Sequence, residues 1–174
     1  MKKILIILLI ALALTGISCK TTAPAPASGP VSTYEPVIEG DVTQAKVNEV
    51  LTEIYNEYRD KLDLSDAQEY TVVRGDTLSQ ITRNYYGNLR DVGEAGPNNG
   101  FYFPVIMMAS NSIIVDPDLI DPGMKLVIID LKKNLDNPGI RKAIKECLID
   151  VAYVYNKKGI PVKEEGLKKL AESL

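Results

Sequence analysis

The chain has 174 residues, and its 20 Lys and Arg against 23 Asp and Glu give a formal net charge of −3. This acidic balance implies no basic surface for nucleic acid, so we expect no nucleic-acid partner. The chain contains no His, which excludes zinc-dependent amidases and hydrolases with a Cys–His or Ser–His–Asp arrangement, because these need an imidazole as ligand or base. We therefore expect no catalytic residue, no metal site and no cofactor.

The N-terminal segment has the pattern of a secretory signal. Lys2 and Lys3 precede an apolar run over residues 4–14, and short residues follow the run up to Cys19. The run is shorter than the roughly 20 residues that span a bilayer as a helix. We therefore interpret residues 1–18 as a signal peptide that directs the chain across the inner membrane.

The residues around Cys19 resemble a bacterial lipobox, the processing site of lipoproteins. Ser18 and Ile17 fit its loose pattern, whereas Gly16 stands where an aliphatic residue is usual. The resemblance implies lipidation of Cys19 and a lipid-anchored chain in the cell envelope that faces the periplasm. The alternative is ordinary secretion without lipid. Residues 19–40, rich in Pro, Ala, Ser and Thr, predict a flexible tether.

Residues 41–66 predict an amphipathic helix followed by a polar break. Apolar residues recur there at intervals of three and four, which places them on one helical face. They are Val47, Val50 or Leu51, Ile54, Tyr58 and Leu62. This face needs a packing partner, which in the simplest case is the rest of the same chain.

The densest local signal lies in residues 70–87. Residues 70–74 are rich in β-formers and stop at Gly75, so they predict a short strand. Thr77, with Gln80 three residues later, has the capping-box pattern, which predicts a helix that begins here. Gly87 is expected to end this helix in the left-handed conformation.

A long loop, a second helix and a second strand follow. Gly and Pro in quick succession predict a loop over residues 87–103, and Pro104 suits the first turn of a helix that ends near residue 110. Pro122 and Gly123 suit a type II turn before a strand at residues 124–129. Residues 131–174 predict packing helices.

Two stretches of the sequence resemble the LysM domain family. "YTVVRGDTLSQI", from residue 70, matches the family's opening pattern Y-x-V-x-x-G-D-T-L-x-x-I, and "NSIIVDPDLIDPGMKLVI", from residue 111, matches its closing half. The resemblance covers residues 70–130, with a long insertion at 87–103 that compact members lack. It implies an α+β fold: a small βααβ domain with two helices on one side of a two-stranded antiparallel sheet, here flanked by amphipathic helices.

The resemblance also implies a binding site for GlcNAc-containing glycans such as peptidoglycan or chitin. Family members bind these glycans in a shallow groove between the first strand-to-helix loop and the second helix-to-strand loop. Carried onto this chain, the candidate glycan-binding residues are Arg74, Gly75, Asp76, Thr77 and Leu78 in one loop and Asp116, Pro117, Asp118, Leu119 and Ile120 in the other.

The residue types leave alternatives open at several of these positions. Asp76 and Thr77 either touch sugar or only cap the helix, and Leu78 either contacts an acetyl methyl or belongs to the core. In the insertion, Phe101 and Tyr102 either offer a sugar-stacking surface or pack back onto the two helices.

The whole pattern predicts a lipid-anchored, non-catalytic binder of peptidoglycan or another GlcNAc-containing glycan, which links or positions the envelope membrane and the cell wall. The alternative is an envelope adaptor, in which the flanking helices dock another envelope protein and the LysM unit is a structural module. LysM domains also accompany peptidoglycan hydrolases, but the flanks here carry no Ser or Cys placed beside a base.

Overall fold

The computed structural model describes residues 34–87, 99–111, 114 and 116–174. The predicted signal peptide, Cys19, most of the predicted tether and residues 88–98 of the insertion lie outside the described residues. In chain order the elements are α1 (Gln44–Arg59), β1 (Gln68–Thr71), α2 (Leu78–Tyr86), the 3₁₀ helix η1 (Asn99–Tyr102), α3 (Phe103–Ala109), β2 (Lys125–Ile128), α4 (Leu131–Asp136), α5 (Pro138–Lys157) and α6 (Pro161–Glu172).

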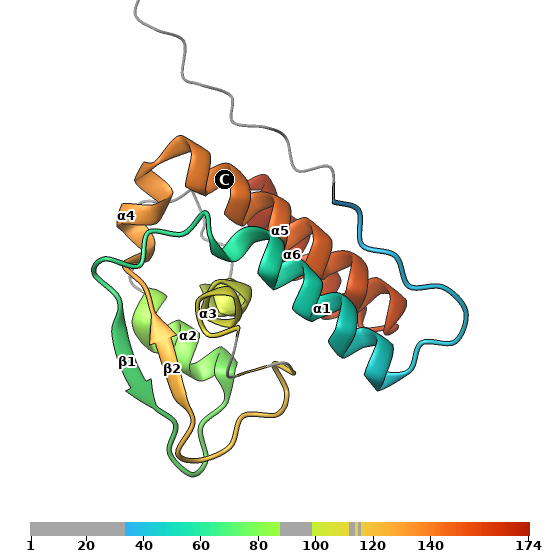
Figure 1. The fold of residues 1–174 in the computed structure, drawn as a ribbon, viewed down its shortest axis with the longest axis horizontal. Helices are drawn as coiled ribbons and strands as arrows, with labels where there is room; N and C mark the ends of the chain where they lie inside the picture. Colours follow the sequence, from blue (N-terminus) through green and yellow to red (C-terminus); the bar gives the residue numbers. More distant parts are fainter. Residues whose placement is uncertain (1–33, 88–98, 112–113, 115) are drawn as a thin grey trace, which may run out of the picture.

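The two strands form an antiparallel sheet with α2 and α3 packed on one face (Figure 1). Gln68 lies opposite Ile128, and Tyr70 lies opposite Leu126. The predicted α+β class and the βααβ unit are therefore confirmed.

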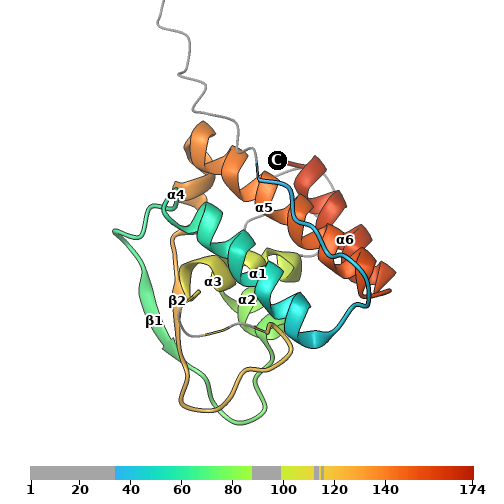
Figure 2. The ribbon, with the colours of Figure 1, turned by 45° about the vertical axis from the view of Figure 1, so that its right-hand side comes forward.

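Helix α3 lies at the centre of the core. Its sequence, FPVIMMA, is apolar on all sides, and all of its residues are buried, as expected for a helix without a polar face. It contacts α2 and β2 on one side, and α1 and α5 on the other. In Figure 2, α1 and the antiparallel pair α5 and α6 lie beside this unit. The flanking helices and the βααβ unit thus share one hydrophobic core.

Several local signals have the predicted effect. Thr77 caps α2, with its Oγ1 accepting a 3.3 Å hydrogen bond from the Gln80 N–H, and Pro104 occupies the first turn of α3. Gly123 has a φ of 94°, and Met124 N donates to Asp121 O over 3.1 Å, which closes the predicted turn.

Other local details differ from the predictions. Strand β1 ends at Thr71 rather than at residue 74, because the chain turns from Val73, whose carbonyl accepts from the Asp76 N–H at 3.1 Å. The prediction that Gly87 is left-handed is wrong: its φ is −65°. A Cβ at Gly87 would overlap the carbonyl oxygen of Arg83, so close backbone approach is the physical reason for glycine there.

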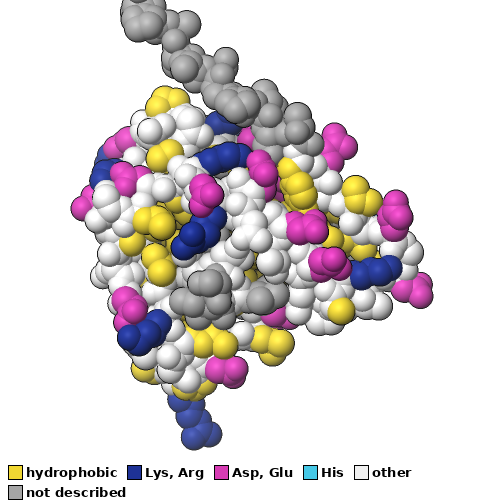
Figure 3. Space-filling view, viewed as in Figure 1, with side chains coloured by type: hydrophobic (Ala, Val, Ile, Leu, Met, Phe, Trp, Pro, Cys, Tyr) yellow, Lys and Arg dark blue, Asp and Glu magenta, His cyan; other side chains and the backbone are white. Residues whose placement is uncertain are grey.

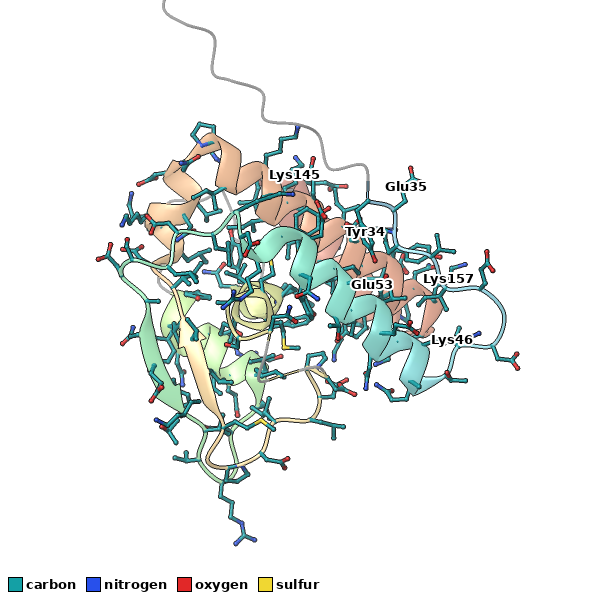
Figure 4. All side chains as sticks on the ribbon, viewed as in Figure 1. Tyr34, Glu35, Lys46, Glu53, Lys145 and Lys157 are labelled. Carbon is teal, nitrogen blue, oxygen red and sulfur yellow. The ribbon has the colours of Figure 1, made fainter. Side chains whose placement is uncertain are left out.

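The last part of the predicted tether, residues 34–40, packs on α1 and α5 (Figures 2 and 4). Tyr34 donates to Glu53 Oε2 over 3.2 Å, and the Ile38 N–H donates to the Tyr153 hydroxyl over 3.3 Å. Ile38 itself belongs to the buried core. The composition of this segment predicts a tether although the segment is packed, because only two or three of its side chains make these contacts.

Candidate functional site

Of the two loops that the sequence marks as the candidate site, the one between β1 and α2 lies at the lower edge of Figure 1, and the one between α3 and β2 descends towards it from the middle of the view. We call residues 73–78, between β1 and α2, the first loop, and residues 116–120, between α3 and β2, the second loop. Val72 joins their bases: its N–H donates to Met124 O at 2.8 Å, and its carbonyl accepts from the Gly123 N–H at 2.9 Å. The first loop is therefore fixed against the turn at residues 121–124, which leads from the second loop into β2.

Asp76 shapes the first loop. Its Oδ2 accepts a 2.7 Å hydrogen bond from the Tyr70 hydroxyl and a 2.9 Å bond from the Val73 N–H. The bond to the Asp76 carboxylate raises the pKa of Tyr70, so this hydroxyl stays protonated as a donor. One oxygen of Asp76 thus already has two partners within the fold.

The outer surface of the first loop is made by its neighbours. Gly75 has a φ of 97°, in the left-handed region, and a Cβ there would meet no atom within 4 Å. Its backbone is therefore open to close approach by a ligand. Val73 is 57% exposed, Arg74 and Thr77 are exposed as well, and Leu78 is buried in the core.

The second loop is folded around Asp116. This side chain is only 8% exposed, and its Oδ1 accepts from the Asp118 N–H at 2.9 Å. Its Oδ2 accepts a 2.6 Å bond from Gln44 Nε2 of α1, far away in the sequence. Asp116 is therefore a structural centre of the loop.

The rest of the second loop divides into buried and exposed residues. Pro117 is buried and Ile120 packs partly against the core, whereas Leu119 is 65% exposed. The Asp118 carboxylate pairs with Lys163 Nζ of α6 at 2.7 Å and with Lys158 Nζ at 4.0 Å.

The predicted residues of the two loops have different environments. Arg74, Gly75, Thr77, Asp118 and Leu119 face solvent, while Leu78, Asp116 and Pro117 are buried. Figure 3 shows hydrophobic side chains near the lower edge of the molecule, where the loops lie, and acidic and basic side chains mixed over the rest of this face.

Three residues at this site were not predicted from the sequence. Val73 lies just before the first predicted position and carries an exposed apolar side chain. The only sequence signal for Val73 at this site is that it is a β-branched residue within the predicted strand. Gln44 and Lys163 contact the second loop from distant helices, and nothing in their local sequence points to this contact.

The described aromatics of the insertion pack inward. Tyr102 is buried, and its ring makes an edge contact with Tyr86 at a centroid distance of 6.3 Å. Phe101 lies against Gly166 of α6, where a Cβ would overlap its ring. Of the two alternatives for these aromatics, the structure therefore shows packing onto helices.

Among residues 34–87, 99–111, 114 and 116–174, no group of three or more His, Cys, Asp or Glu is placed to hold a metal ion. No helix in the same ranges is long and apolar enough to cross a membrane. Cys147 is fully buried, and burial raises the pKa of its thiol, which makes it a poor nucleophile.

A hollow of about 530 Å³ lies away from the loops, between residues 37–39 and α1. Glu39, Glu49, Lys46 and Glu53 line it, and Figure 4 labels the last two on α1. Lys46 Nζ donates to the Glu39 carbonyl at 2.7 Å, so its ammonium is already engaged in holding the tether end.

Comparison with known proteins identifies one domain. The LysM domain family matches residues 70–94, which include the second half of β1, the first loop and α2. No curated protein and no solved structure gave a significant match. The chain thus contains a LysM domain, and this domain suggests binding of GlcNAc-containing glycans such as peptidoglycan.

Proposed function

We propose that the chain is a non-catalytic binder of GlcNAc-containing cell-wall glycan, with peptidoglycan as its ligand. The observation that carries this proposal is the LysM match at residues 70–94. The surface formed by the first and second loops is the proposed binding site.

The exposed groups of the two loops suit a sugar with an acetamido substituent. Val73 and Leu119 each present an aliphatic side chain to solvent, one from each loop, which gives apolar contact for an acetyl methyl. The open backbone at Gly75 and the side chains of Arg74 and Thr77 supply hydrogen-bonding groups for hydroxyls and the amide. Neither loop contains an aromatic residue, so recognition rests on hydrogen bonds and aliphatic contact rather than ring stacking.

The proposed cellular role adds a lipid at Cys19. The lipobox resemblance supports an anchor there, and residues 20–33 form the spacer before the packed segment. The flexible tether that their composition predicts would have a root-mean-square span of about 20 Å. Fixing the chain at the membrane raises its effective concentration near the wall, so a weak glycan contact is sufficient. The chain then links or positions envelope membrane and cell wall, on the periplasmic side.

The adaptor alternative needs the apolar faces of the flanking helices to be free to bind another protein. Ile54, Tyr58, Ile144, Val151 and Tyr155, the apolar stripes of the flanking helices, are all buried within this chain. They pack against one another and against α3, and the same side chains are then not free to dock another envelope protein.

The experiment is sedimentation with insoluble peptidoglycan, using the chain without its signal peptide and with Cys19→Ser. We expect the protein to sediment with the glycan and to bind soluble GlcNAc oligomers in calorimetry. Leu119→Ser should weaken both, whereas Ile149→Ser, a matched exposed aliphatic on α5, should change neither. A chain that stays in the supernatant and binds no oligomer would disprove the proposal.

The proposal that the chain has no hydrolytic activity is tested separately. A cell-wall suspension incubated with the purified chain should keep its turbidity. A steady loss of turbidity, with release of soluble fragments, would instead identify a hydrolase.

A further inference from the structure

Two aspartates of the second loop are each held by a helix from outside the βααβ unit. Asp116 Oδ2 accepts from Gln44 of α1 at 2.6 Å, and Asp118 Oδ1 pairs with Lys163 of α6 at 2.7 Å. These partners are separated from the aspartates by 72 and 45 residues. The second loop is therefore tied to both flanking segments of the chain.

Lys163 is a fixed partner rather than a mobile surface cation. Its side chain is 28% exposed, and its Nζ lies 4.7 Å from the ring centroid of Tyr155 and 5.9 Å from that of Phe103. Tyr155 is fully buried in α5. Two aromatic faces thus orient the ammonium towards Asp118, which adds a cation–π contribution to the ion pair.

The anchored aspartates lie just before Leu119, the exposed aliphatic residue of the second loop. Asp116 also accepts the Asp118 N–H on its side chain and the Leu119 N–H on its carbonyl, at 2.9 and 3.1 Å. Both anchors therefore act on the short segment that presents Leu119 to solvent. A loop ordered before binding loses less conformational entropy when the ligand arrives.

We propose that Lys163 and Gln44 are positioning residues: α6 and α1 hold the second loop in its binding geometry, and Asp118 serves as an anchor point rather than as a sugar ligand. This inference rests on the proposed glycan function. On this inference, α1 and α6 hold the binding site in shape but do not contact the glycan.

The test is a double-mutant cycle on the full mature chain, with dissociation constants for a soluble GlcNAc oligomer. Lys163→Met keeps the aliphatic stem over the rings but removes the charge, and Asp118→Asn removes the other partner. Because a partly exposed ion pair contributes up to about 1 kcal/mol, each variant should weaken binding about two- to fivefold. The double variant should bind no more weakly than either single variant.

A matched control uses another ion pair on the same helix. Lys168 pairs with Glu164 at 2.6 Å within α6, and Lys168→Met should leave the affinity unchanged. If Asp118→Asn weakens binding while Lys163→Met does not, Asp118 touches the sugar and the inference is wrong. It is equally wrong if the two losses multiply in the double variant.

A second measurement separates this inference from the proposed function. Hydrogen exchange of the Asp118 and Leu119 amides should be faster in Lys163→Met than in the unmodified chain, while amides of β1 and β2 keep their rates. If the exchange rates of these amides are unchanged in Lys163→Met, whether or not glycan is present, the positioning role is overturned. Failure of the unmodified chain to bind any glycan would instead overturn the proposed function.

Discussion

The Tyr70 hydroxyl and the Asp76 carboxylate are joined by a 2.7 Å hydrogen bond that links β1 to the loop following it. The same Asp76 oxygen accepts the Val73 N–H, so one side chain closes the turn and fixes its orientation against the strand. The aspartate of the "GDT" signature therefore has a structural role that is visible without any ligand.

Asp76→Ala is expected to lower the free energy of unfolding by about 2 kcal/mol, because it leaves the Val73 N–H and the Tyr70 hydroxyl without this acceptor. Tyr70→Phe removes one of the two bonds and should cost about 1 kcal/mol. Urea unfolding measures both. Asp76→Asn is the matched control, since its amide oxygen can still accept. If Asp76→Ala unfolds at the same urea concentration as the unmodified chain yet binds no glycan, the residue is a sugar ligand instead.

The sequence predicts well those features that depend on neighbouring residues. Thr77 with Gln80, Pro104 in the first turn of α3, and Gly123 in its turn all act over three or four positions. Their conformational preferences are intrinsic to the residue types, so the pattern is sufficient.

Features that depend on distant packing could not be predicted in this way. The contact of Gln44 with Asp116 and that of Lys163 with Asp118 arise only once α1 and α5 lie on α3 and α6 lies on α5 and η1. The glycine at position 166 likewise reads as a poor helix residue until Phe101 is seen against it. The same holds for residues 34–40, whose composition favours a tether although Ile38 is in the core.

Gly166→Ala should destabilise the chain by about 1 kcal/mol, although alanine is the better helix former. The reason is steric, because the added Cβ would overlap the ring of Phe101 and displace it from α6. Thermal unfolding of Gly166→Ala measures the effect. In the Phe101→Ala background, Gly166→Ala should cause no further loss of stability. An equal penalty in both backgrounds would mean that Phe101 is not the obstacle.

Asn134→Ala should be among the more damaging single substitutions, at about 2 to 4 kcal/mol. Asn134 is fully buried, and its side chain accepts from the Asp63 N–H at 2.9 Å and donates to the carbonyls of Asp63 and Asp130 at 3.0 and 2.8 Å. Its loss leaves these part-buried groups without their partner. Chemical denaturation gives the value, and the exposed Lys132→Ala on the same helix serves as control, with an expected change below about 0.5 kcal/mol. Equal stability of the two variants would contradict this role.

Asp150 of α5 is expected to make stability depend on pH. Burial, and after it the negative charges of Glu146, Glu57 and Glu35, raise the pKa of its carboxyl to about 6, against the lowering effect of the hydrogen bond from the Tyr58 hydroxyl. Because this pKa lies above the unfolded value of 3.8, the folded chain binds the extra proton. The corresponding stability is present at pH values below 3.8 and is lost as pH rises to 6 and beyond.

Asp150→Asn should remove this loss, since the amide is uncharged and its oxygen still accepts from Tyr58. With allowance for solvent screening of a partly buried carboxyl, the unmodified chain should lose about 1 kcal/mol more than Asp150→Asn between pH 4 and pH 7. Urea unfolding at the two pH values gives the comparison. Glu172→Gln, at an exposed carboxylate near the end of α6, should follow the unmodified chain. Parallel pH profiles for the unmodified chain and Asp150→Asn would show that another group controls the dependence.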